Sequence, residues 1–74
     1  MHNFEKVDLL TKILTKNIDK WLTSREIHLV LLCQYPKQSK EFKSNKEIGQ
    51  LLKRVNNLLS RKVSNKIFYK LAVD

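Results

Sequence analysis

The chain has 74 residues, a formal net charge of +8, and only one glycine and one proline. This length suits one small domain, and the scarcity of glycine and proline predicts that most of the chain lies in regular secondary structure. The single cysteine, Cys33, excludes an internal disulfide framework, and no apolar run approaches the roughly 20 residues of a membrane span. We therefore expect a soluble cytoplasmic protein.

The positive charge is distributed unevenly along the chain. Residues 1–36 contain five Lys or Arg and four Asp or Glu, whereas residues 37–74 contain ten and three, so the net charges are +1 and +7. A concentration of one sign predicts an anionic partner, most simply a nucleic acid. Codon bias is the alternative, because 12 lysines against three arginines, with six asparagines, is typical of an AT-rich genome. Bias does not explain why the acids concentrate in the first half.

The first predicted element is an amphipathic helix over about residues 4–18. Its apolar residues recur at helical spacing, and charged residues occupy the other side. The apolar set is Val7, Leu10, Ile13, Leu14 and Ile18.

The second predicted helix spans residues 24–34. Thr23 and Glu26 have the spacing of a capping box, and Leu22 with Ile27 has that of a hydrophobic staple. Pro36 ends the helix, because the residue before a proline is biased away from helical angles. This helix is apolar almost all round, which predicts that it is covered on several sides and that Cys33 is buried.

A polar, basic connection over residues 36–43 leads to the third predicted helix, over about residues 45–60. Ser44 and Glu47 form a second capping box at its start. At about 100° per residue, its aliphatic residues fall on one side, and Gly49 predicts a close approach of the second helix. The opposite side carries Lys46, Gln50, Lys53 and Asn57, flanked by Arg54 and Arg61.

The last segment changes to a two-residue period. Ile67, Tyr69, Leu71 and Val73 alternate with other residues, which predicts a half-buried strand. A turn at residues 64–66 pairs it with residues 61–63, so the hairpin spans about residues 61–73. A short strand near Trp21 is a candidate third strand, and the Trp21 side chain is expected in the core.

These elements predict a mainly α fold of the α+β type, with three helices and a C-terminal β-hairpin. The runs SNKEIGQLLKR (residues 44–54) and KIFYKL (residues 66–71), in this order of elements, resemble the winged helix-turn-helix superfamily. Within it, the chain is similar to C-terminal winged-helix domains of virus and plasmid primase–helicases. The resemblance implies that the third helix enters the major groove of DNA and that the hairpin, or wing, contacts the backbone or the minor groove. The connection is longer than a tight helix-turn-helix turn, and the chain contains no ATPase motif.

The candidate nucleic-acid-binding residues lie on the third helix and the hairpin. Gln50 and Asn57 suit pairing with adenine, Arg54 suits guanine, and lysines neutralise phosphates. The alternative is the solvated face of an ordinary amphipathic helix. The full set is Asn45, Lys46, Gln50, Lys53, Arg54, Asn57, Arg61, Lys62, Lys66, Phe68 and Lys70.

Three alternatives remain open at this level. Phe68 either stacks on a base or covers the second side of the sheet against the first helix. The lysines of the 36–43 connection either contact the DNA backbone near the third helix or belong to a solvated loop. A different register has helical elements over residues 45–53 and 55–62, and its base-facing set is Asn56, Asn57, Ser60 and Arg61.

No catalytic or metal-binding pattern is recognisable. The Ser, His and Asp residues lack the spacing of a triad, and His2, His28 and Cys33 are too few and too poorly spaced for a metal site. We therefore expect a non-enzymatic domain without a cofactor or metal.

The expected ligand is double-stranded DNA, bound in replication or transcriptional control, with single-stranded nucleic acid as a further candidate. The alternative function is a winged helix that binds another protein through an exposed apolar patch, including Phe4, Leu9 or Phe68. A homodimer or a larger replication assembly is compatible with both.

Overall fold

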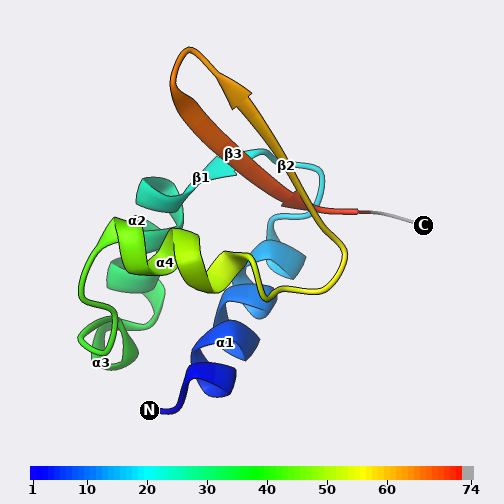
Figure 1. The fold of residues 1–74 in the computed structure, drawn as a ribbon. Coiled ribbons are helices and arrows are strands. Elements are labelled where there is room, and N and C mark those ends of the chain that lie inside the picture. Colours follow the sequence, from blue (N-terminus) through cyan, green and yellow to red (C-terminus); the bar gives the residue numbers. More distant parts are fainter. Residues whose placement is uncertain (73–74) are drawn as a thin grey trace.

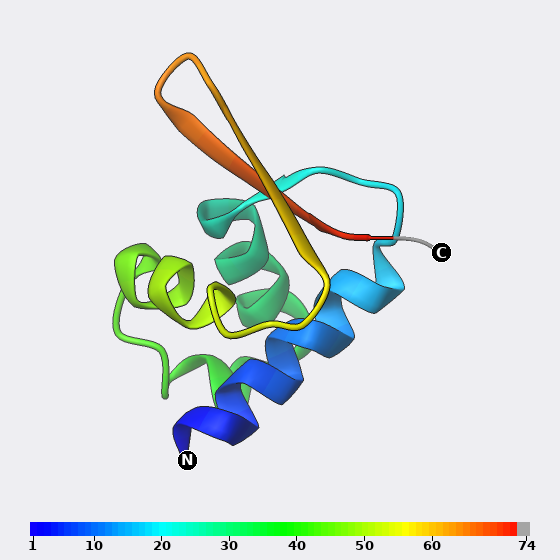
Figure 2. The same cartoon turned by 45° about the vertical axis from the view of Figure 1, so that its right-hand side comes forward.

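The order of elements is α1 (Asn3–Lys16), β1 (Leu22–Thr23), α2 (Ser24–Gln34), α3 (Pro36–Ser39), α4 (Asn45–Leu52), β2 (Leu58–Val63) and β3 (Lys66–Leu71). These elements come from a computed structural model that describes residues 1–72, so the predicted strand residue Val73 lies outside the described part. The result is a small α+β domain with four helices and a three-stranded antiparallel sheet (Figure 1). The β2–β3 hairpin projects away from the helices (Figures 1 and 2). No helix in residues 1–72 is long and apolar enough to cross a membrane.

The core lies between α1, α2 and α4, and the sheet closes one side of it. Leu22 of β1 and Tyr69 of β3 are both 8% exposed and belong to the same apolar cluster as the helices. Burial of each large aliphatic side chain stabilises the fold by about 1.5–3 kcal/mol. The fully buried side chains are Leu10, Ile13, Leu14, Ile27, Leu31, Ile48 and Leu52.

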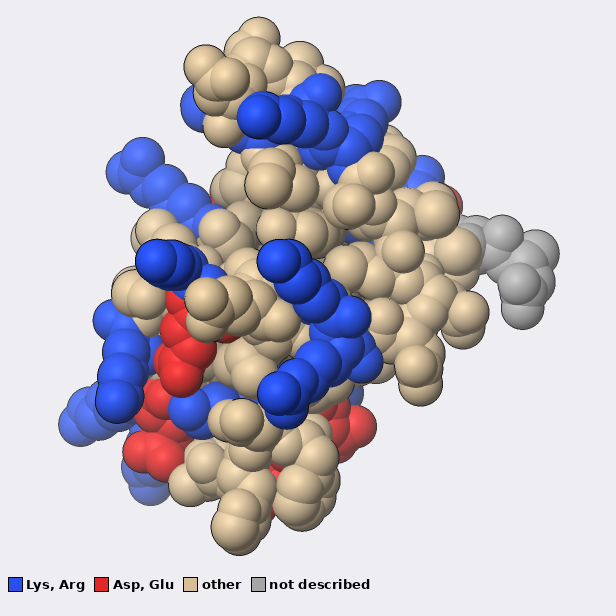
Figure 3. Space-filling view, viewed as in Figure 1, with Lys and Arg blue, Asp and Glu red and all other residues tan. Residues whose placement is uncertain are grey.

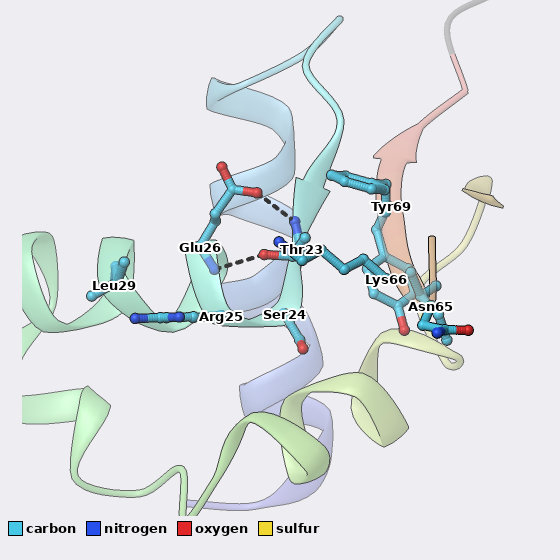
Figure 4. Close-up of a pocket in the computed structure, with 10 residues that line it drawn as sticks. Thr23, Ser24, Arg25, Glu26, Leu29, Asn65, Lys66 and Tyr69 are labelled. Carbon is cyan, nitrogen blue, oxygen red and sulfur yellow. Dashed lines mark hydrogen bonds between the residues drawn. The ribbon is translucent and has the colours of Figure 1, made fainter. Parts of the chain in front are cut away.

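The start of α2 has the predicted capping box. The Thr23 amide donates to Glu26 Oε1 at 3.0 Å, and the Glu26 amide donates to Thr23 Oγ1 at 3.1 Å (Figure 4). Leu22 and Ile27, the predicted staple residues, are both buried. The predicted bounds of α2, residues 24–34, are confirmed.

The prediction that α2 is covered on several sides is wrong. Leu29 and Leu32 are 51% and 52% exposed, and Cys33 is exposed rather than buried. Ile27 and Leu31 carry the contact with the core, so only one side of α2 is covered. The high apolar content of the helix therefore overstated its burial.

The third predicted helix, over residues 45–60, is about twice as long as the observed helix of 8 residues. Helix α4 ends at Leu52, and Asn57 takes a left-handed conformation with φ of 62°. Leu58 then begins β2. This strand pairs with β3 over its whole length, starting with Leu58 opposite Leu71. The register with a second helix over residues 55–62 is wrong for the same reason.

The connection between α2 and α4 contains a short helix that the sequence analysis missed. Pro36 is the first residue of α3, a position where its missing amide and fixed φ are tolerated. Ser39 is buried, and its hydroxyl donates to the Pro36 carbonyl oxygen at 2.7 Å. The end of α1 was also placed too late, and Ile18, beyond its last residue Lys16, is 43% exposed.

The sheet has the strand order β1–β3–β2, which confirms the short strand next to Trp21. The hairpin turn lies at Ser64 and Asn65, within the predicted turn over residues 64–66, and both residues have positive φ. Side chains alternate across a sheet, so the buried Tyr69 and the partly buried Leu71 identify the face toward the helices. The opposite face, called here the outer sheet face, consists of Leu59, Arg61, Val63, Lys66, Phe68 and Lys70.

Candidate nucleic-acid interface

Helix α4 presents a polar stripe opposite its buried side. Lys46, Gln50 and Lys53 are exposed and follow helical spacing, and they are called here the α4 stripe. The exposed Arg54 follows directly in the turn after the helix. In Figure 3, Lys and Arg side chains lie over α4 and the hairpin, whereas Asp and Glu side chains are in view at α4 and below it but not over the hairpin. Within residues 45–54, the cationic side chains of the candidate face are therefore exposed to solvent.

Glu47, the only acid of α4, is turned away from the α4 stripe. Its Oε1 accepts from the Lys43 amide at 2.7 Å, and its Oε2 accepts from Lys6 Nζ at 3.3 Å. The hydrogen bond from the Lys43 amide, and then Lys6, lower the pKa of Glu47 below its ordinary value. The predicted capping box is half formed, because Ser44 Oγ accepts from the Glu47 amide at 3.2 Å but the carboxylate bonds Lys43 instead of Ser44.

Lys6 of α1 holds the Glu47 carboxylate away from the α4 stripe, and the sequence analysis did not identify this lysine. Its side chain is 10% exposed, forms the ion pair with Glu47, and places Nζ 5.6 Å from the centre of the Phe42 ring. A buried lysine is stable only with a partner of this kind. The available signal was its spacing from Leu10 and Ile13, which puts Lys6 on the buried side of α1.

Asn45, at the first turn of α4, is engaged within the domain. Its Oδ1 lies 2.7 Å from His28 Nδ1 on α2, which is hydrogen-bonding distance. This bond ties α4 to α2 near the start of the candidate face. Asn45 as a whole is exposed at the protein surface.

Two predicted members of the helix face lie elsewhere. Asn57 is in the turn after α4, where its carbonyl oxygen accepts from the Ala72 amide at 2.7 Å. Arg61 is on β2, on the outer sheet face. Asn57 was assigned to the third helix because that helix was predicted to continue to about residue 60, whereas Arg61 was expected both to flank the helix face and to begin the hairpin.

The hairpin residues divide between the two faces of the sheet. Lys62 lies in the row of Tyr69, toward the side of α4, whereas Lys66, Phe68 and Lys70 lie on the outer sheet face. The idea that Phe68 covers the sheet against α1 is therefore wrong, because Tyr69 has that inward position, where burial raises the pKa of its hydroxyl. The predicted binding residues form two surfaces instead of one.

Gly49 does not mark a close approach of α2. A Cβ at this position would meet the Tyr69 hydroxyl at 3.7 Å, which is an ordinary contact. The structure therefore gives no steric reason for glycine at this position of α4.

The lysines of the basic connection are all exposed. Lys37 belongs to α3, and Lys40 and Lys43 follow it, so the segment is partly helical instead of a plain loop. Lys43 lies next to the start of α4 through its amide bond to Glu47.

The apolar surface differs from the predicted one. Leu9 is 8% exposed and belongs to the core, whereas Phe4 is 72% exposed. A groove of about 620 Å³ lies between the start of α2 and the hairpin, with Leu29 and Ile67 in its walls (Figure 4). The exposed apolar residues are thus on α2 and the hairpin as well as at the start of α1.

Comparisons of the chain with protein-family models, with curated proteins and with solved structures find no match. Within residues 1–72, no three His, Cys, Asp or Glu side chains are grouped so as to hold a metal ion.

Proposed function

We propose that this chain is a winged helix-turn-helix domain that binds double-stranded DNA. Helix α4 enters the major groove, and the hairpin forms the wing beside it. The order of helices and strands and the β1–β3–β2 sheet support this assignment, since the hairpin follows α4 directly.

The observation that carries the proposal is the absence of negative charge along the α4 stripe. Lys46 and Lys53 are exposed, and the carboxylate of Glu47 is bound to Lys6 and to the Lys43 amide. The exposed charges along the α4 stripe are therefore all positive, and the one acid of α4 is engaged by Lys6 and the Lys43 amide. Phosphates of a DNA backbone provide the matching charge, and Gln50 between the lysines suits the edge of an adenine.

Arg54 and Lys62 extend this surface toward the hairpin. Arg54 follows the last turn of α4, and Lys62 lies on the side of the sheet that faces α4. Arg54 and Lys62 are expected to contact phosphates on either side of the major groove. Asn45, which is bonded to His28, is expected near the base pair at the start of α4. Replication or transcriptional control is the biological context that we infer for such a module.

Charge reversal tests the proposal. Lys53→Glu combined with Arg54→Glu should lower the affinity for a mixed-sequence duplex by on the order of 100-fold at low salt, because two phosphate contacts become repulsions. The measurement is fluorescence anisotropy of a labelled duplex of about 25 base pairs, at two salt concentrations.

The matched control is Lys12→Glu combined with Lys20→Glu. Both side chains are exposed, on α1 and in the turn after it, and the double substitution changes the net charge by the same amount. It should weaken binding less than about 5-fold through the overall field alone. Equal losses in the two variants would show that net charge, and not α4, determines binding.

A protein-binding role is the second candidate, and the exposed apolar surface favours it. Leu29 and Leu32 on α2 are half exposed, and Ile67 lies across the groove from Leu29. A partner that covers this groove, or a second copy of the chain, would bury them. Absence of duplex binding at low salt, together with a dimer in sedimentation that Leu29→Glu abolishes, would favour this role.

A further inference from the structure

The outer sheet face is a cationic surface separate from the α4 stripe. The Tyr69 hydroxyl lies beside Gly49, so α4 is on the inward side of the sheet. Arg61 and Lys70 belong to the rows that point the other way. A duplex held against α4 therefore leaves the outer sheet face open.

Trp21 holds two of the cations on this face. The Arg61 guanidinium carbon lies 4.5 Å from the centre of a Trp21 ring, and Lys70 Nζ lies 5.3 Å from it. Such cation–π contacts are favourable and limit the movement of both side chains. Trp21 is accordingly half-buried at the sheet surface instead of in the core, and Arg61 is exposed to solvent.

The cations of this face have no ion-pair partner in the described part of the chain. No ion pair among residues 1–72 includes Arg61, Lys66 or Lys70, and no acid occurs in the β2 and β3 rows on this side. Two cations that share one aromatic ring repel each other, and an anion beside them relieves that repulsion. Charge complementarity therefore favours a polyanion.

The apolar part of the face distinguishes among polyanions. Phe68 is directly opposite Arg61 in the β2–β3 pair and next but one to Lys70 along β3. Leu59 and Val63, in the same rows, are 43% and 47% exposed. Aromatic and apolar side chains between cations suit a strand whose bases are unpaired, whereas paired bases are hidden in a duplex. The six residues of β3 extend about 20 Å, the length of a few nucleotides.

We propose that the outer sheet face binds single-stranded DNA. Bases stack against Phe68 and the Trp21–Arg61 pair, and phosphates lie beside Lys66 and Lys70. The proposal does not rest on duplex binding by α4. If both surfaces are used, the domain holds a duplex and an adjoining unpaired strand on opposite sides of the sheet.

Trp21 is the only tryptophan of the chain, so its intrinsic fluorescence reports on this face. Titration of the wild-type protein with oligo(dT) of 12 nucleotides should quench this fluorescence saturably, and added salt should weaken the binding. With a labelled oligonucleotide, Phe68→Leu should lower the affinity about 10-fold, and Lys66→Gln combined with Lys70→Gln about as much.

Lys46→Gln combined with Lys53→Gln is the matched control, because it removes the same charge from the α4 stripe. It should change oligo(dT) affinity less than about 3-fold, so a failure of this proposal is distinguishable from a failure of duplex binding. Circular dichroism melts establish that each variant is folded. If Phe68→Leu is unstable, the test of the proposal is the affinity of the Lys66→Gln and Lys70→Gln double variant for oligo(dT).

Three results would overturn the proposal. The first is oligo(dT) binding without a change in Trp21 fluorescence, and the second is equal loss of affinity in the outer-face and α4 lysine pairs. The third is binding of inorganic polyphosphate of matched charge as tightly as oligo(dT), because that would exclude a contribution from the bases.

Discussion

Helices α1 and α4 are both amphipathic and both carry lysines, but they use them differently. Lys6, Lys12 and Lys16 of α1 each contact a carboxylate or a tyrosine hydroxyl of the domain. Lys46 and Lys53 of the α4 stripe have no hydrogen bond or ion pair among residues 1–72. Codon bias accounts for lysines on both helices, but it does not account for this difference. What distinguishes α4 is therefore that no acid in residues 1–72 pairs with its exposed lysines, and not that it has more lysines than α1.

The largest expected effect comes from breaking the link between the two helices. Glu47→Gln removes the carboxylate that partners Lys6 and leaves a buried ammonium without its ion-pair partner. Unfolding in urea at pH 7 should show a loss of about 2 kcal/mol in the free energy of unfolding. Asp8→Asn, which breaks the exposed pair with Lys12, should cost less than about 0.5 kcal/mol. Equal costs would contradict the structural role of the Glu47 carboxylate.

The same carboxylate should make stability depend on pH. The pKa of Glu47 is lower in the folded chain, first through the Lys43 amide and then through Lys6. Its stabilisation is therefore complete above the unfolded-state pKa and is lost as the pH falls through the folded-state pKa. The stability difference between wild type and Glu47→Gln, measured by urea unfolding from pH 7 to pH 3, should shrink toward acid. A constant difference over that range would be inconsistent with this assignment.

An acid added to the α4 stripe should pair with its lysines, as the acids near α1 pair with the lysines of α1. Gln50→Glu places a carboxylate between Lys46 and Lys53, and we expect duplex affinity to fall about 10-fold, equivalent to about 1.4 kcal/mol. Thr15→Glu, on an exposed position of α1, is the control and should have less than about a 2-fold effect. The measurement is anisotropy with the labelled duplex, and similar losses in both variants would remove the distinction between the helices.

The smallest effect concerns Gly49. Its conformation is helical and an added Cβ would find ordinary contact with the Tyr69 hydroxyl, so Gly49→Ala should stabilise the domain by about 0.5–1 kcal/mol. The melting temperature measures this directly. Destabilisation would mean that α4 and β3 approach each other more closely than the structure indicates.

The parts of the fold fixed by local chemistry were predictable from the sequence. The reciprocal bonds between Thr23 and Glu26 start α2, Pro36 follows its end, and the asparagine turn at Asn65 closes the hairpin. Each depends on residues within a few positions of one another, and each was expected.

The parts that depend on distant partners were not predictable. Leu58 and Leu59 fit the period of a helix as well as that of a strand, and only pairing with Leu71 and Lys70 decides for the strand. Because β2 begins at Leu58, Arg61 lies within a strand, on the outer sheet face beside Trp21, and does not flank the face of α4. The predicted third helix is therefore confirmed only over residues 45–52, and the candidate cations of the helix and of the hairpin lie on two surfaces.

The salt dependence of duplex binding by Lys53→Gln combined with Arg54→Gln tests the central proposal most directly. If both side chains contact phosphates, the slope of log affinity against log salt should become shallower by about 1.8 than in the wild type. Anisotropy titrations at several salt concentrations give this slope without reversing any charge. A slope equal to that of the wild type would contradict the assignment of α4 as the helix that contacts DNA.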